Sequence, residues 1–234
     1  MLLSFSYFNS SLVSLKSKSL YITTGYSTIT TGYSKMVEIS ENGKIALKLI
    51  FTDFLTNYNS YNIKDKIGLS NAGSLKLLRS LGKKNLLVSE KMGNAIFYKP
   101  NLNNEYLLKL LELTFLGHSN LSNFVKGWVY DLKSFVPITK AIFLFGSILK
   151  EGKEARDVDV CFIIKSPKDY SKLQVKVNET NKKNRLKVHP LYLTAKDFEE
   201  KLKEKDKPLL EMIKNCVVIQ GQELFVKVLK NVQG

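Results

Sequence analysis

The sequence predicts an α/β (α+β) protein with two folded domains, and three observations carry this prediction. Apolar residues recur at helical spacing through much of residues 44–82 and 103–135, as in amphipathic helices. Short apolar runs at 141–145 and 160–164 have the length of buried strands. A Gly-Ser pair and the tripeptide Asp-Val-Asp lie between these two runs. We therefore expect a largely helical N-terminal domain and a C-terminal domain with a small mixed sheet flanked by helices.

Composition limits the partners of the chain. Its 234 residues are 44% hydrophobic, which is enough for one or two cores. Lys and Arg number 36 against 21 Asp and Glu, and a net charge of +15 favours a polyanionic partner, although a generally basic surface gives the same balance. Cys161 and Cys216 form no Cys-x-x-Cys pattern, which fits a reducing cytoplasm rather than a disulfide framework or structural zinc site. No apolar run approaches membrane-spanning length, so we expect no membrane partner.

Residues 1–36 differ from the rest of the chain. Residues 1–35 contain three lysines and no acidic residue, and the motif Thr-Thr-Gly-Tyr-Ser occurs at 23–27 and again at 30–34. A transit peptide would be expected to contain arginine, and serines interrupt any signal-peptide core. The composition instead predicts a disordered extension, or a start codon placed upstream of Met36.

Residues 41–116 predict a second region with three helices and a hairpin. The expected elements are a helix at 44–58, a short piece at 63–67, a helix at 71–82 with Ser70 as N-cap, strands at 85–90 and 95–100, and a helix at 103–115. Gly93 and Asn94 supply the turn between the two strands. Three helices followed by a hairpin is the order of a winged helix-turn-helix, whose third helix normally lies in the DNA major groove.

The charge of this region supports double-stranded DNA as a partner. Residues 44–104 hold ten basic and three acidic residues, a net charge of +7. The candidate DNA-binding residues are Ser70, Asn71, Ser74, Lys76, Arg79, Lys83, Lys84, Lys91 and Asn94. The alternative is a small helical domain that packs against its neighbour, dimerises or binds another protein.

Residues 117–137 predict a linking helix between the domains. Apolar residues recur at helical spacing through 118–135, and Pro137 ends the pattern. We expect Trp128 to lie in the core rather than to act as a stacking platform.

Asp157 and Asp159 are the strongest candidates for chemistry. Side chains two apart in a strand point to the same face, so these carboxylates project together while Val158 and Val160 face away. Two adjacent carboxylates repel each other unless a cation lies between them. Mg²⁺ prefers carboxylate oxygen and leaves positions open for substrate phosphates.

The Gly-Ser pair predicts a place for those phosphates. The strand at 141–145 leads to Gly146 and Ser147, where backbone N–H groups and the serine hydroxyl can hold phosphate oxygens. Lys150 and Lys153 follow in the loop and either neutralise a triphosphate or remain solvated.

This stretch resembles the polymerase β-like nucleotidyltransferase superfamily, and most of all its minimal nucleotidyltransferases. The resemblance lies in the order of a strand, Gly-Ser, nine residues, Asp-x-Asp and a second strand. The resemblance covers about residues 138–232. With the N-terminal region, the layout is similar to predicted prokaryotic regulators. It implies a nucleotidyltransferase fold for residues 138–234, Mg²⁺ on Asp157 and Asp159, and NTP phosphates near Gly146 and Ser147. It also implies nucleotidyl transfer to an acceptor hydroxyl.

The sequence departs from the family pattern at two positions. Active members usually carry a third carboxylate on the neighbouring strand, but residues 186–193 contain no acid. His189 stands closest to that place and is either a base near neutral pH or a structural residue at a strand edge. Arg156 precedes Asp157 and either clamps a phosphate or pairs with that carboxylate.

These observations lead to a cytoplasmic DNA-binding protein with a domain that binds Mg²⁺-NTP and transfers a nucleotidyl group to a protein or nucleic-acid hydroxyl. Two alternatives remain open. One is a transcription regulator whose inactive C-terminal domain acts in ligand sensing or dimerisation. The other is an antitoxin-type transferase that modifies a toxin-like protein partner. The sequence also leaves a homodimer open.

Overall fold

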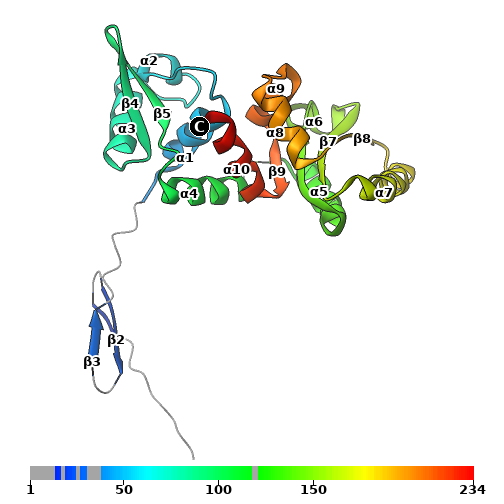
Figure 1. Ribbon diagram of the computed structural model, residues 1–234, viewed down its shortest axis with the longest axis horizontal. Helices are drawn as coiled ribbons and strands as arrows, with labels where there is room; N and C mark the ends of the chain where they lie inside the picture. The colour runs from blue at the N-terminus through cyan, green and yellow to red at the C-terminus, as the bar shows by residue number, and fades with distance from the viewer. Residues whose placement is uncertain (1–13, 17–18, 25–26, 31–37, 118–120) are drawn as a thin grey trace, which may run out of the picture. The chain divides into compact units, whose positions relative to one another are not determined.

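The computed structural model describes residues 14–16, 19–24, 27–30, 38–117 and 121–234, and these divide into units 1–39 and 40–234 (Figure 1). In the first unit β1 (Ser14–Lys16), β2 (Ser19–Thr24) and β3 (Ser27–Thr30) form an antiparallel sheet. The expectation of disorder for residues 1–36 did not include these strands. The other residues of that segment lie outside the described part of the chain, so the expectation is untested there.

The second unit begins with four helices and a hairpin. The elements are α1 (Glu41–Thr52), α2 (Ser60–Ile63), α3 (Asn71–Lys83), β4 (Leu87–Met92), β5 (Ala95–Pro100) and α4 (Glu105–Leu116). Ser70 caps α3 as expected, since its side chain accepts a hydrogen bond from the N–H of Gly73 at 3.1 Å. The two strands pair antiparallel around Gly93, which has a φ of +59°.

The first helix is shorter than the sequence indicated. Helical spacing predicted a helix to residue 58, but α1 ends at Thr52 with Asp53 as its C-cap. Tyr58 instead bridges to β5, where the N–H of Tyr98 donates to the carbonyl of Tyr58 at 2.8 Å. The Tyr58 hydroxyl also donates to Asp53 at 2.6 Å. These tertiary contacts outweigh the local helical pattern.

The rest of the unit surrounds a four-stranded sheet. The helices are α5 (Asn123–Leu132), α6 (Ile148–Glu151), α7 (Tyr170–Lys183), α8 (Ala195–Lys203), α9 (Lys207–Asn215) and α10 (Gln222–Gln233). The strands are β6 (Thr139–Phe145), β7 (Asp157–Ile164), β8 (Lys187–Leu193) and β9 (Val217–Gln220), in the order β8-β7-β6-β9. Three short 3₁₀ helices occupy Lys133–Ile138, Gly152–Glu154 and Pro167–Asp169. The sheet is mixed, because β6 runs antiparallel to β7 and β9 while β7 and β8 are parallel. The predicted mixed α/β class is confirmed.

The linking helix begins later than predicted. Ser122 caps α5 through the N–H of Val125, and residues 118–120 lie outside the described part of the chain. Trp128 is 6% exposed and belongs to the core, as expected.

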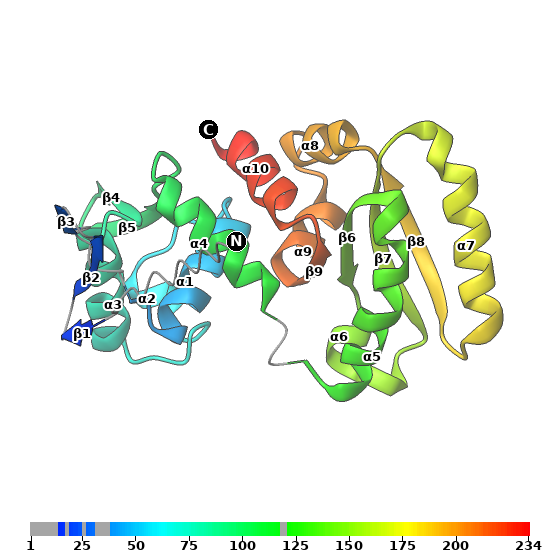
Figure 2. The same cartoon turned by 90° about the horizontal axis from the view of Figure 1, so that it is seen from below.

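Side chains of β7 alternate between the two faces of the sheet, and both faces are covered by helices. Val158, Val160 and Phe162 pack in a core cluster with residues of α5 and α7. On the opposite face, Phe143 of β6 contacts Phe198 of α8 and Phe225 of α10, with ring centroids 5.4 and 5.2 Å apart. In Figure 2, α9 and α10 lie on one side of the strands and α7 on the other.

The edge strand β8 has an unusual outer side. The N–H of Val188 donates to the side-chain oxygen of Asn181 at 2.7 Å, and the carbonyl of Val188 accepts from the Asn181 amide at 3.1 Å. Asn181 lies on α7, so the outward backbone groups of Val188 are already paired. Pro190, two residues later, has no N–H to donate.

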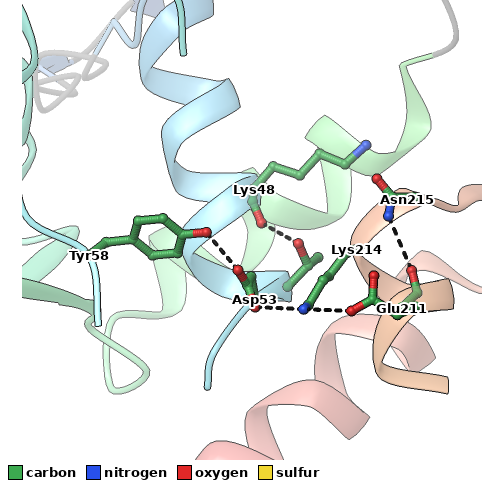
Figure 3. A network of polar contacts seen from close by, with 7 residues as sticks. Lys48, Asp53, Tyr58, Glu211, Lys214 and Asn215 are labelled. Carbon is green, nitrogen blue, oxygen red and sulfur yellow. Dashed lines mark hydrogen bonds and ion pairs between the residues drawn. The ribbon is translucent and has the colours of Figure 1, made fainter. Parts of the chain in front are cut away.

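Helices α4 and α10 join the N-terminal and C-terminal halves of this unit. The ring of Phe115 on α4 meets the ring of Phe225 at 4.9 Å in an edge-to-face contact. Figure 3 shows Asp53 between the Tyr58 hydroxyl and the Lys214 ammonium group, whose Nζ lies 3.0 Å from Asp53 Oδ1. The two halves therefore share a partly charged, partly aromatic junction. None of the helices described is long and apolar enough to cross a membrane.

Candidate functional site

Two neighbouring strands, β7 and β8, bring the candidate catalytic residues together, and a third strand, β6, leads to the Gly-Ser turn beside them. Asp159 on β7 is the Cα partner of Phe145 on β6 and of His189 on β8. Asp157 lies two residues earlier on the same strand and therefore on the same face. One side-chain oxygen or nitrogen atom from each of Asp157, Asp159 and His189 lies within 4.8 Å of the others. This is close enough for all three to bind one metal ion.

The two carboxylates are half-buried, whereas the imidazole is exposed. His189 Nδ1 lies 3.1 Å from Asp159 Oδ1, a hydrogen-bonding distance, and the His189 side chain is 75% exposed. The Asp159 side chain is 23% exposed, so solvent reaches this carboxylate as well as the imidazole.

The Gly-Ser turn forms one wall of this cluster. Gly146 has a φ of +82°, and a Cβ atom there would lie 2.0 Å from Asp159 Oδ2. Only glycine fits between the turn and the carboxylate. The hydroxyl of Ser147 forms no hydrogen bond to any described residue, and α6 follows directly. The turn thus leaves polar groups available beside Asp159.

The basic candidates stand around this turn on the surface. Lys150, Lys153 and Arg156 are all exposed. The ammonium group of Lys153 lies 4.0 Å from the neighbouring Glu154 carboxylate. Within the described residues Arg156 forms no ion pair, so the pairing with Asp157 that the sequence left open is not present. Its guanidinium group remains available to an anion.

An apolar pocket next to the cluster was missed by sequence reasoning. It has a volume of about 240 Å³ and contains Phe145, Leu191 and Leu193 from the sheet and Leu209 and Met212 from α9. Leu191 and Leu193 follow His189 at intervals of two, so they share its face of β8. That alternation was the available signal, but α9 supplies the other wall and no local pattern predicts its position.

The candidate DNA-binding residues lie on α3 and the hairpin. Lys76, Arg79 and Lys83 are exposed and spaced by three and four residues, so they share one face of α3. Lys91 and Asn94 are exposed on either side of Gly93 at the tip of the hairpin.

The remaining DNA candidates differ from one another. Ser70 and Asn71 are exposed at the start of α3, with Ser70 engaged as its cap, and Lys84 is half-buried. The prediction that Ser74 contacts DNA is corrected, because Ser74 is completely buried and its hydroxyl donates to the carbonyl of Ser60 at 2.7 Å. Ser74 joins α2 to α3 and has no surface to offer to DNA.

Comparison of the chain with models of protein families, with curated proteins and with solved structures finds no match. Any functional assignment therefore depends on the residues and geometry described above.

Proposed function

We propose that this protein binds a nucleoside triphosphate with Mg²⁺ at Asp157 and Asp159, transfers its nucleotidyl group to a hydroxyl, and binds duplex DNA through its N-terminal half. The convergence of Asp157, Asp159 and His189 beside the Gly146 turn carries this proposal. Carboxylate pairs next to a turn with free backbone and hydroxyl donors suit a metal-bound phosphate.

The donor set fits one hard divalent ion. The carboxylates of Asp157 and Asp159 lie close enough to hold the ion together, and the exposed imidazole of His189 lies within 4.8 Å of them without being needed as a ligand. When bound, Mg²⁺ would neutralise charge on the phosphates and on the departing pyrophosphate. The protein would orient the phosphates with Gly146 and Ser147, and Arg156 would add a positive charge from the loop.

The imidazole of His189 has a separate role in this proposal. It lies in register with Asp159, near where the resemblance leads us to expect a third carboxylate. A neutral imidazole can accept the proton of an acceptor hydroxyl near neutral pH. The attacking oxygen would then form a bond to the α-phosphorus as the bond to pyrophosphate breaks.

The lack of a third carboxylate favours a second candidate function. Strand β8 (Lys187–Leu193) has no acidic residue, so one carboxylate ligand expected for a second metal ion is missing. A domain of this kind would bind nucleotide with little or no transfer and would act as the ligand-sensing part of a transcription regulator.

The N-terminal half supports the DNA-binding part of the proposal. Its order of three helices and a hairpin, with Tyr58 bridging to β5, supports the proposal of a winged helix-turn-helix. Lys76, Arg79 and Lys83 form a basic face on the helix that this motif places in the major groove. Lys91 lies at the tip of the corresponding wing.

The deciding experiment is incubation with α-labelled ATP, CTP, GTP or UTP and Mg²⁺, with protein and nucleic acid as acceptors. Label transferred to an acceptor with release of pyrophosphate supports the transferase. Saturable, Mg²⁺-dependent nucleotide binding without transfer supports the sensing regulator. Absence of both nucleotide binding and transfer with all four nucleotides contradicts both functions.

A further inference from the structure

A second cavity lies at the junction of the two halves, away from the carboxylate cluster. Its volume is about 430 Å³, within the range of small-molecule sites. One side is formed by α1, the loop after it and the hairpin, and the other by the ends of α8 and α10. A molecule in this cavity would touch both halves of the unit.

The lining of this cavity combines apolar and polar side chains. Ile50, Tyr98 and Leu202 are buried residues of its lining, and Leu55 and Val88 line it while remaining 50% and 46% exposed. Exposed leucine and valine side chains beside a cavity lose contact with water when a ligand covers them. Burying apolar surface contributes about 25 cal/mol per Å². The lining therefore favours a ligand with an apolar body.

Tyr98 adds a polar group without a partner. It is 4% exposed, and its hydroxyl forms no hydrogen bond to any described residue. The hydroxyl oxygen itself is accessible to solvent. A ligand oxygen that accepts its hydrogen bond would take the place of a water molecule.

The charge of the lining is positive. Lys99, Lys203 and Lys205 contribute to it, and none of its lining residues is acidic. Lys99 and Lys203 also pair with Glu90 and Glu199, at 2.9 and 2.7 Å. No described acidic group lies within 4.0 Å of the Lys205 ammonium group, which retains three hydrogen-bond donors.

We propose that this junction cavity binds a small organic anion with an apolar body, held by its carboxylate, sulfonate or similar group at Lys205 and Tyr98. The inference does not depend on nucleotide binding at Asp157 and Asp159. The lining residues come from two segments of the chain, within 50–102 and within 202–233. A bound ligand therefore stabilises the packing of these two segments against each other by mass action. The ligand would act as an effector that ties the two halves together.

The probe for this proposal is 8-anilino-1-naphthalenesulfonate, which combines aromatic rings with one sulfonate. The full chain should bind it at one saturable site, with enhanced fluorescence and a higher melting temperature. The neutral analogue N-phenyl-1-naphthylamine should bind about ten-fold more weakly, the loss expected for one charge-assisted hydrogen bond. Decanoate, an aliphatic anion, should displace the dye.

Three variants with matched controls locate the site. Lys205→Glu and Leu55→Glu should each weaken dye binding about ten-fold by placing an acid beside the sulfonate. Lys172→Glu and Leu113→Glu make the same changes at exposed positions outside the lining and should leave it unchanged. Tyr98→Phe removes only the hydroxyl and should weaken binding about five-fold.

Several results would overturn the proposal. Equal affinity for the charged and neutral dyes would show that the cavity has no anion-binding site. Equal losses in Leu55→Glu and Leu113→Glu would mean that the dye binds elsewhere. Displacement of the dye by duplex DNA in place of decanoate would assign the lysines to a nucleic-acid surface.

Discussion

Gly146 and Asp159 lie so close that a Cβ atom on Gly146 would be 2.0 Å from Asp159 Oδ2. Since the turn and the carboxylate share this space, a side chain at Gly146 must displace one of them. The φ of +82° at Gly146 adds strain of about 1–2 kcal/mol for any L-residue.

Gly146→Ala should therefore lower Mg²⁺ or Mn²⁺ affinity at least about ten-fold, because Asp159 can no longer keep its position. Gly152→Ala is the matched control, with a φ of +60° and no atom within 4 Å of the added Cβ. It carries the backbone strain without the contact. Calorimetric titration of both variants measures the difference, and equal losses would contradict a role for the Gly146–Asp159 contact.

Replacing both carboxylates, as in Asp157→Asn with Asp159→Asn, should abolish Mg²⁺-dependent nucleotide binding. The unfolding free energy should stay the same or rise, because two like charges are removed from one face. Asp65→Asn with Asp131→Asn removes two exposed carboxylates elsewhere and should leave nucleotide binding intact. Nucleotide binding that survives the first pair of substitutions would exclude Asp157 and Asp159 as the metal ligands.

His189→Asp tests the role of the imidazole. If the site lacks a third carboxylate ligand, the new oxygen ligand should raise nucleotidyl transfer above a slow wild-type rate. Single-turnover assays with labelled NTP measure the change. Vigorous wild-type transfer that His189→Asp abolishes would instead make His189 a working base.

Replacing Lys76, Arg79 and Lys83 with alanine should weaken duplex binding and flatten its dependence on salt. Each lost phosphate contact reduces the slope of log K against log salt by about 0.9. A control with alanine at Lys168, Lys172 and Lys182 removes equal charge from other exposed positions. Equal slopes for the two triple variants would show that the α3 face has no specific role.

The Asp53–Lys214 contact should stabilise the junction in a pH-dependent way. Burial raises the pKa of Asp53, but the Tyr58 hydroxyl and the Lys214 ammonium group outweigh it and leave the pKa below its usual value. The stabilisation is therefore complete above the unfolded carboxyl pKa of about 4 and disappears as pH falls below it.

Asp53→Asn should cost about 1–2 kcal/mol of unfolding free energy at pH 7, because it removes the carboxylate that pairs with Lys214, which keeps only its pair with the exposed Glu211 at 3.0 Å. The difference from wild type should shrink at pH 3. Glu200→Gln, which breaks an exposed pair with Lys196, should cost about 0.5 kcal/mol or less. Urea denaturation at both pH values checks this, and a pH-independent difference would contradict the charge interaction.

Periodic patterns predicted most of the elements of residues 40–234 but not their ends. The strands of the four-stranded sheet and the Ser70 cap follow from local sequence, because alternation and capping act over a few residues. The early end of α1 does not follow from local sequence, because the carbonyl of Tyr58 accepts a hydrogen bond from the distant Tyr98 N–H.

The candidate site was predictable as far as one strand positions its residues. The spacing of Asp157 and Asp159 indicated a shared face, and the position of His189 on the next strand was inferred from the family layout. The assignment of Ser74 to DNA binding was wrong, because its polar side chain is buried against Ser60, which lies 14 residues away in sequence. The junction cavity and the Asp53–Lys214 contact depend on how two halves of the chain pack, which no local pattern encodes.

The outer side of β8 also limits how this protein can associate with other chains. Alternate residues of an edge strand offer their N–H and C=O groups outward, and an incoming strand needs them to pair. Asn181 already occupies both groups of Val188, and Pro190 has no donor. Neighbouring molecules therefore find no continuous ladder to extend at this edge, which protects the sheet against strand-by-strand growth into aggregates.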